Sequence, residues 1–249
     1  MPLLMSELDR RGAAALTAAL GACALVLPDA IIPTAEAGEK NHRPDKAADG
    51  NDEVPATEDL MREHGVLRRT LIVYAELSDR LRKPNATVDP AALAEAAKLF
   101  REFGEDYHEH MLEEQYVFPE VRKVGGPDEK LVEILLLQHR RGREITDYLY
   151  TVGTSGRIGG EAEALSKALA AMSRMYQAHA AWEDTVIFPA WKKTQSKERL
   201  GELAEKFEAI EHERFGKDGF ADALDRIVRI EQAVGLADLA AYTAPAPGH

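Results

Sequence analysis

Two segments of this chain end in nearly the same way, and this repeat constrains the fold more than any other feature. The segments are YHEHMLEEQYVFP (residues 107–119) and YQAHAAWEDTVIFP (residues 176–189). In each, a tyrosine stands three residues before a histidine, a glutamate follows that histidine by four residues, and Phe-Pro closes the segment. One histidine also precedes each segment: His64 lies 46 residues before His110, and His139 lies 40 residues before His179. This internal similarity predicts a duplicated helical hairpin.

The spacing of apolar residues predicts four long helices. Apolar positions recur at helical intervals over residues 58–81, 90–118, 129–152 and 161–188. Thr57 and Asp89 are plausible N-caps, and Pro119 and Pro189 are expected to end their helices. No segment shows the sustained period-two alternation of a strand. We therefore expect an all-α fold, an up-down-up-down antiparallel four-helix bundle with additional C-terminal helices over 196–215 and 217–242.

Such a bundle would bring histidine and glutamate side chains to one depth. On an α-helix, positions i and i+4 share a face, so each His-x-x-x-Glu pair points both side chains toward the bundle axis. At 1.5 Å per residue, the first two histidines lie about 27 Å and about 31 Å from the first interhelical loop, which is within one turn of each other. The predicted metal ligands are His64, His110, Glu114, His139, His179 and Glu183.

Neighbouring polar residues are interpreted differently. His108 and Glu113 lie about 100° off the predicted apolar face, so we interpret them as supporting or solvated side chains. Asp184 is an alternative to the glutamate that precedes it, although the repeat favours the glutamate. Tyr107 and Tyr176 are typical of a helical core, and either could donate a hydrogen bond to a bound oxygen species.

The ligand types point to metal ions. A buried glutamate costs several kcal/mol unless it is paired or bound to a metal, and no Lys or Arg lies on the predicted apolar faces. A single cysteine in the chain excludes a disulfide framework, a Cys-based zinc site and an iron–sulfur cluster built from this chain. Imidazole with carboxylate suits iron or manganese, and zinc is possible. Two carboxylates able to bridge predict a dinuclear centre, most simply two iron ions.

The order of these residues resembles that of the hemerythrin-like (HHE cation-binding) domain family. The pattern His64, His110-x-x-x-Glu114, His139, His179-x-x-x-Glu183 is similar to the family's ligand pattern over residues 57–190. The resemblance implies a four-helix bundle with a non-haem di-iron centre. Two differences from known family members reduce the number of functions that the resemblance implies. The oxygen carriers of the family have a histidine where this chain has Arg143, and its iron–sulfur repair members carry a further cysteine-bearing domain that this chain lacks.

Three functions are consistent with this pattern. The first is a di-iron protein of the cell envelope that reacts with peroxide, superoxide, oxygen or nitric oxide, with catalase- or peroxidase-like turnover as one form. The second is a module that senses or stores oxygen, nitric oxide or iron without turnover. The third is a structural bundle that holds metal only incidentally.

The N-terminal residues predict export. Arg10 and Arg11 precede a short apolar run over 12–27, which resembles a degenerate twin-arginine signal, and an ordinary secretory signal is the alternative. Cleavage after Ala37 is favoured over lipidation of Cys23, so we expect a signal peptide over 1–37 and a periplasmic or secreted protein without a transmembrane helix. Residues 38–56 read as a disordered tether, 57–215 as the bundle with its following helix, and 216–249 as a C-terminal helical tail.

The net charge of the chain limits the kinds of partner that it can bind. Acidic residues outnumber basic ones by 43 to 31, which leaves a net charge of −12 and argues against a nucleic-acid partner. The expected partners are small oxygen or nitrogen species, and the sequence does not predict an oligomeric state.

Overall fold

The computed structural model describes residues 54–85 and 87–247, and that part of the chain is helical with no strand, which confirms the all-α prediction. The predicted signal, Cys23 and most of the predicted tether lie outside the described residues. The elements in chain order are α1 (Ala56–Leu81), α2 (Pro90–Leu99), the π-helical η1 (Phe100–Val117), α3 (Phe118–Val124), α4 (Pro127–Thr154), the short 3₁₀ helix η2 (Gly159–Glu161), α5 (Ala162–Trp182), the π-helical η3 (Glu183–Ile187), α6 (Phe188–Thr194), α7 (Lys197–Phe215), α8 (Gly219–Val234) and the 3₁₀ helix η4 (Leu239–Tyr242).

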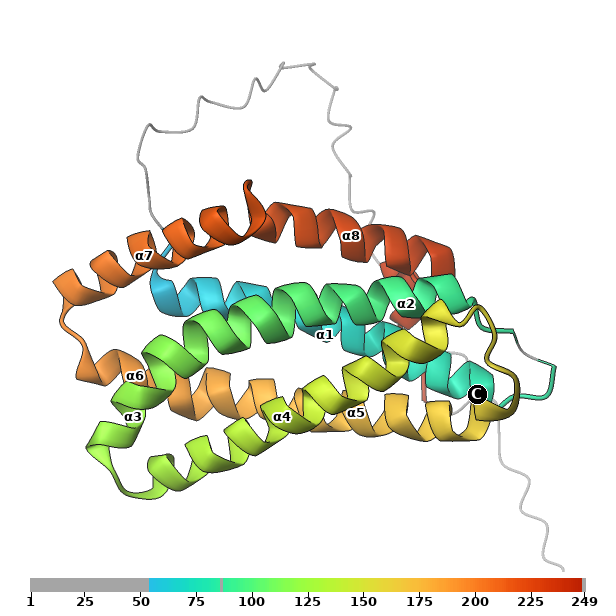
Figure 1. Cartoon of the computed structure of the whole chain (residues 1–249), viewed down its shortest axis with the longest axis horizontal. Helices are drawn as coiled ribbons and strands as arrows, with labels where there is room; N and C mark the ends of the chain where they lie inside the picture. The colour runs from blue at the N-terminus through green and yellow to red at the C-terminus, as the bar shows by residue number, and fades with distance from the viewer. Residues whose placement is uncertain (1–53, 86, 248–249) are drawn as a thin grey trace, which may run out of the picture. The chain divides into compact units, whose positions relative to one another are not determined.

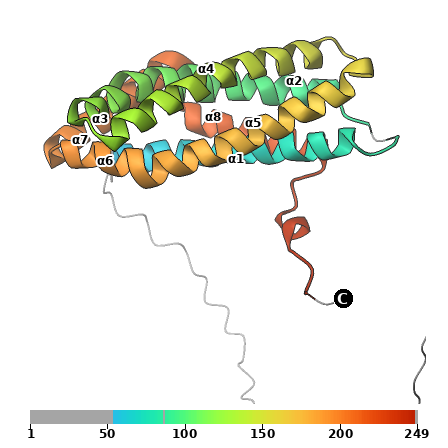
Figure 2. The same cartoon turned by 90° about the horizontal axis from the view of Figure 1, so that it is seen from below.

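Long helical stretches lie side by side, and the last two long helices cover them along one side (Figure 1, Figure 2). α1 packs against α5, α2 packs against α4, and α4 also contacts α5. α8 lies against α1 and α2, and α7 lies against α1 and η1. Aromatic and leucine side chains fill the space between these helices, and the largest fully buried ones include Trp191, Tyr74, Tyr107, Phe100 and Phe103. The helices therefore enclose an apolar core.

The predicted start signal is present at α2 but not at α1. The side chain of Asp89 accepts a hydrogen bond from the backbone N–H of Ala91 at 2.9 Å, and Pro90 occupies the first position of α2, as the sequence predicts. α1 begins one residue before the predicted cap, so Thr57 lies buried inside the first turn and caps nothing. The cap position belongs to Pro55, whose ring presets a φ of −57° next to the first helical residue.

The two Phe-Pro pairs do not end their helices, contrary to the sequence prediction. Pro119 lies in the first turn of α3 and Pro189 in the first turn of α6, and each helix continues for several residues beyond its proline. Both prolines directly follow a π-helical segment. The wider turn of a π segment relieves the clash between a proline ring and the carbonyl four residues earlier, so the helix passes through the proline.

A glycine sets how closely α2 and α4 approach. Gly153 belongs to α4 rather than to the predicted loop over 153–160. A Cβ atom at this position would lie 2.7 Å from the backbone nitrogen of Ala94. Because glycine has no side chain, the two backbones can touch, and the last turn of α4 is retained against α2.

The second C-terminal helix is shorter than the sequence predicts. α7 matches the predicted range of 196–215 closely, but α8 ends at Val234 instead of near residue 242. Gly235, with φ of +73°, terminates it in the left-handed conformation that glycine adopts without strain. Among the described helices, none combines the length and the apolar character needed to cross a membrane.

Candidate metal centre

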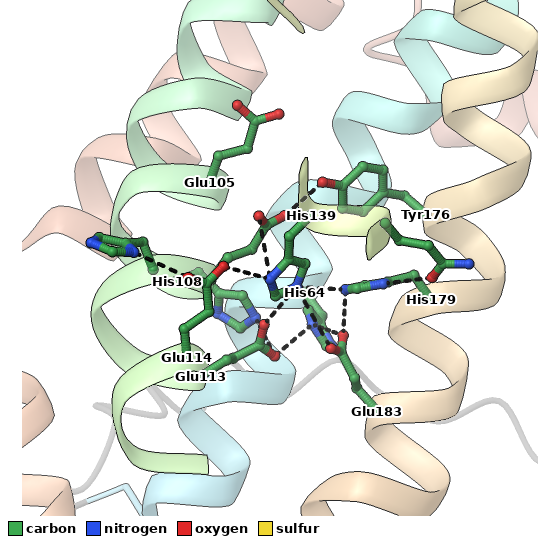
Figure 3. A network of polar contacts seen from close by, with 12 residues as sticks. His64, Glu105, His108, Glu113, Glu114, His139, Tyr176, His179 and Glu183 are labelled. Atoms are coloured by element: carbon green, nitrogen blue, oxygen red, sulfur yellow. Dashed lines mark hydrogen bonds and ion pairs between the residues drawn. The ribbon is translucent and has the colours of Figure 1, made fainter. Parts of the chain in front are cut away.

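Six histidine and glutamate side chains meet in the space between the helices (Figure 3). One histidine comes from each of α1, η1, α4 and α5, and the glutamates come from η1 and from the first residue of η3. All six residues are at most 3% exposed. The members are His64, His108, Glu113, His139, His179 and Glu183.

The cluster divides into two groups of histidines with the carboxylates between them. Glu113 Oε1 lies 3.2 Å from His108 Nε2, while its Oε2 lies 3.4 Å from His139 Nε2. Glu183 Oε2 lies 3.0 Å from His179 Nε2 and 3.5 Å from His64 Nε2. Each carboxylate therefore faces one histidine of each group. This is the arrangement in which two cations would share two bridging carboxylates.

Every histidine of the cluster turns its second ring nitrogen outward to a side-chain acceptor. The Nδ1 atoms of His64, His108, His139 and His179 lie 2.7, 2.5, 2.9 and 2.9 Å from side-chain oxygens of Asp184, Glu63, Glu114 and Gln138, respectively. A proton on Nδ1 that donates to these oxygens leaves each Nε2 directed at the centre of the cluster. Such outward hydrogen bonds orient metal-bound imidazoles and select their tautomer.

Buried polar atoms in the cluster lack hydrogen bonds. Both carboxylate oxygens of Glu113, both of Glu183 and Nε2 of His108 have no hydrogen-bond partner within the described structure. Leaving a buried carboxylate unsatisfied costs several kcal/mol. The residues present therefore fit metal cations, which would satisfy these atoms together, and this part of the chain holds a buried His/Glu cluster that could bind metal.

The electrostatics of the cluster without metal agree with this chemistry. Burial raises the pKa of Glu113, but the facing His108 and His139 outweigh burial and leave this pKa well below its usual range. Burial lowers the pKa of His139, yet Glu109 and Glu113 outweigh it and raise the pKa to about 10. Without metal, protons on His64, His108 and His139 thus balance ionised carboxylates. Metal ions would replace those protons, because ligands must be deprotonated to bind.

The structure brings together four of the six predicted ligands. His64, His139, His179 and Glu183 lie in the cluster. His110 does not: its side chain is 62% exposed, and within the described part of the chain its side-chain hydrogen bond is to Glu114, at 3.2 Å.

Glu114, His108 and Glu113 also lie in positions that differ from the sequence prediction. Glu114 lies outside these six residues, but with Glu109 and His139 it forms an adjoining group that could also hold a metal ion. It accepts hydrogen bonds from His139 Nδ1 at 2.9 Å and from Arg143 at 2.8 Å. The inward positions predicted for His110 and Glu114 belong instead to His108 and Glu113, which helical periodicity predicts to lie off the apolar face. Asp184, the alternative to Glu183, accepts outer hydrogen bonds from His64 and Arg68.

The difference arises from the π-helical geometry of η1. In a π-helix the hydrogen bonds join residues i and i+5, so residues five apart share a face, as His108 and Glu113 do. The sequence holds a signal for this. Counted back from each Phe-Pro pair, Glu113 and Glu183 both stand five residues before the phenylalanine. His108 is then one residue further from its glutamate than His179 is, which is the single insertion that a π turn accommodates.

A small cavity adjoins the cluster between α1 and α5, with room for about one water-sized molecule. Leu67, Leu71 and Ala180 give it an apolar wall, and Tyr176 forms part of the lining. The Tyr176 hydroxyl donates to Glu109 Oε1 at 2.7 Å. Gly142 on α4 makes room for this hydroxyl, because a Cβ atom there would collide with it. Whatever reaches the cavity must therefore be very small.

A buried carboxyl near the cluster predicts a pH-dependent stability. Glu105 is fully buried, and its Oε1 accepts a hydrogen bond from Thr146 at 2.6 Å. Burial and the nearby Glu109 raise the pKa of Glu105 to about 8. The folded protein therefore holds a proton that the unfolded chain has lost, so this residue makes stability fall as pH rises from 4.5 through about 8.

In Glu105→Gln, which stays neutral, this loss should be absent. Urea unfolding of metal-free protein should show the variant gaining at least about 1 kcal/mol over the wild type between pH 6 and pH 9. The exposed Glu95→Gln serves as the control and should follow the wild type. Parallel pH profiles for Glu105→Gln and the wild type would contradict a proton on Glu105.

Comparison with known proteins places the chain in a family. It is 41% identical over 203 residues to Uncharacterized protein Mb2018 of Mycobacterium bovis, a match that covers 81% of this chain and 78% of the relative. Uncharacterized protein MT2051 and Uncharacterized protein Rv1995, from two strains of Mycobacterium tuberculosis, match to the same extent. The chain belongs to the family of these mycobacterial proteins. No family model matches the sequence. No solved structure matches it either.

Proposed function

We propose that this chain is a hemerythrin-like protein with a non-haem dinuclear metal centre, two iron ions, that reacts with small oxygen or nitrogen species such as peroxide. The observation that carries the proposal is the arrangement of the cluster. Two pairs of histidine Nε2 atoms face each other across two buried carboxylates whose oxygens have no hydrogen-bond partner. Imidazole and carboxylate without thiolate is a donor set that iron accepts.

The packing of the helices supports the same proposal. The long stretches through α1, α2 with η1, α4, and α5 with η3 each contribute one histidine, as expected for an up-down-up-down four-helix bundle of the hemerythrin-like type. Export through the predicted signal in residues 1–37, which lies outside the described residues, is part of the proposal. It would place the reaction in the cell envelope.

The protein's own groups favour a small reactant. When bound, iron would supply a Lewis acid and an electron donor or acceptor. The cavity beside the cluster has room for about one water-sized molecule, so this route restricts the reactant to very small molecules and excludes bulky hydroperoxides. Tyr176 and Glu109 line this cavity and provide the hydroxyl and carboxylate that can orient a small oxygen species there. The apolar wall limits the entry of further water.

Peroxide turnover by the iron-loaded full chain tests the proposal. We expect oxygen release from hydrogen peroxide, with two peroxide molecules giving one oxygen molecule and two water molecules. Zinc-loaded protein is the matched control, since zinc occupies similar ligands without redox chemistry. Glu183→Ala loaded with iron should lose most of the activity. No turnover, with a visible band that appears and disappears reversibly with oxygen, would contradict catalysis and support a binding module.

A further inference from the structure

The four histidines of the cluster differ in the side-chain oxygen that accepts the hydrogen bond from their outward-facing Nδ1 atom. Three of the acceptors are carboxylates, those of Asp184, Glu63 and Glu114, and the fourth is the neutral amide oxygen of Gln138. The histidine group formed by His64 and His108 therefore has two carboxylate acceptors. The group formed by His139 and His179 has one carboxylate and one amide.

The charges around these acceptors increase the difference. Glu63 is 1% exposed, and among the described residues its only ion pair is with His108, at 2.5 Å. The carboxylate beside His139 is compensated, because Arg143 contacts Glu114 at 2.8 Å and Glu109 at 3.3 Å. Asp184 is likewise paired, with Arg68. Glu63 is thus the acceptor whose negative charge acts most fully on a single histidine.

An outer acceptor changes how strongly an imidazole binds a metal. A carboxylate that accepts the Nδ1 proton makes Nε2 more basic and holds the ring in position, whereas a neutral amide does so more weakly. Removing such an acceptor costs about 10- to 100-fold in metal affinity. Given the proposed metal centre, on which this step rests, the two positions should therefore differ in affinity.

We propose that the position at His64 and His108 is the tight one, and that the position at His139 and His179 is the weaker, exchangeable one, with Glu63 and Gln138 setting the difference. Metal would then load in order, the His64/His108 position first. The second ion would be the one that equilibrates with the surroundings.

Zinc competition against a chelator tests this order in the metal-stripped full chain. Zinc is the probe because it does not change oxidation state during the titration. The wild type should bind two zinc ions with dissociation constants that differ by about 10-fold or more. We call the two sites the tight class and the weak class. Glu63→Gln should weaken the tight class by about 10- to 100-fold, and Gln138→Glu should strengthen the weak class by a similar factor. Combined, the two substitutions should reverse the difference.

Controls separate affinity from folding and from surface charge. Both substitutions nearly preserve side-chain shape, and circular dichroism should show wild-type helicity. Gln177→Glu, an exposed residue of α5, adds the same charge without touching a ligand and should change neither class by more than about 3-fold. His179→Ala should retain the tight class, while His108→Ala should lose it.

Two outcomes would overturn different statements. Two ions of equal affinity, or a ratio unchanged by Glu63→Gln and Gln138→Glu, would overturn the unequal loading and leave the metal centre in place. Fewer than one ion per chain in the wild type would overturn the proposed metal centre itself.

Discussion

His108→Ala should hold one metal ion or fewer per chain, whereas His110→Ala should hold as many as the wild type. The two histidines lie two residues apart on η1, but His108 is buried in the cluster and the side chain of His110 is 62% exposed. Loss of the His108 imidazole removes a ligand and leaves Glu63 buried without its partner. Loss of the His110 imidazole removes only an exposed contact with Glu114.

Metal analysis of iron-loaded protein, purified without a histidine tag, measures this difference directly. The same pair of variants also tests the π-helical register. If η1 were an ordinary α-helix with His110 and Glu114 facing inward, the two results would be exchanged. Glu113→Ala and Glu114→Ala extend the comparison, because Glu113 faces both histidine groups while Glu114 supports His139 from outside. We expect the larger loss of metal in Glu113→Ala.

Stripping the metal should lower the unfolding temperature by about 10 °C. A ligand at about a thousand times its dissociation constant stabilises the folded state by about 4 kcal/mol, and each kcal/mol is worth about 2–4 °C in a domain of 150–250 residues. The reason lies in the buried carboxylates. Without metal, Glu113 and Glu183 must be balanced by protons on the surrounding histidines instead of by cations.

Calorimetry before and after treatment with a chelator measures this shift, and adding iron back under anaerobic conditions should restore it. The double variant Glu113→Gln/Glu183→Gln is the matched control, since its neutral amides keep the volume of the site but remove the charges that hold cations. Its unfolding temperature should not respond to the chelator. An equal response in the wild type and in this variant would show that the chelator acts elsewhere.

Much of the helical framework could be predicted from local sequence. Asp89 with Pro90 marks the start of α2 by a side-chain cap and a preset φ, both of which act within three residues. His64, His139 and His179 stand at helical intervals among apolar residues, so their inward orientation follows from periodicity alone. These features depend on contacts within one helix, and they remain the same whatever the helix packs against.

The ends of the helices near the two prolines and at the C-terminus were harder to predict, because neighbouring structure overrides the local sequence rules for ending a helix. Proline ends an ordinary α-helix, but Pro119 and Pro189 follow π-helical turns that remove the clash. The Phe118 and Phe188 side chains beside them are buried, so packing holds the helix on both sides of each proline. At the C-terminus, Gly235 ends α8 before an alanine-rich stretch that would otherwise favour helix.

Apolar periodicity and the repeated His and Glu spacing are properties of the linear chain, so the helical fold and the gathering of histidine and glutamate inside it can be predicted without the structure. Which residues of 107–119 face inward depends instead on how the helices pack. One extra residue in η1 rotates His108 and Glu113 into the cluster and His110 out of it, and a π turn is stable only where packing and the buried polar groups compensate its poorer local geometry. The outer acceptors, such as Glu63 for His108, were also beyond prediction, since they come from residues far apart in sequence.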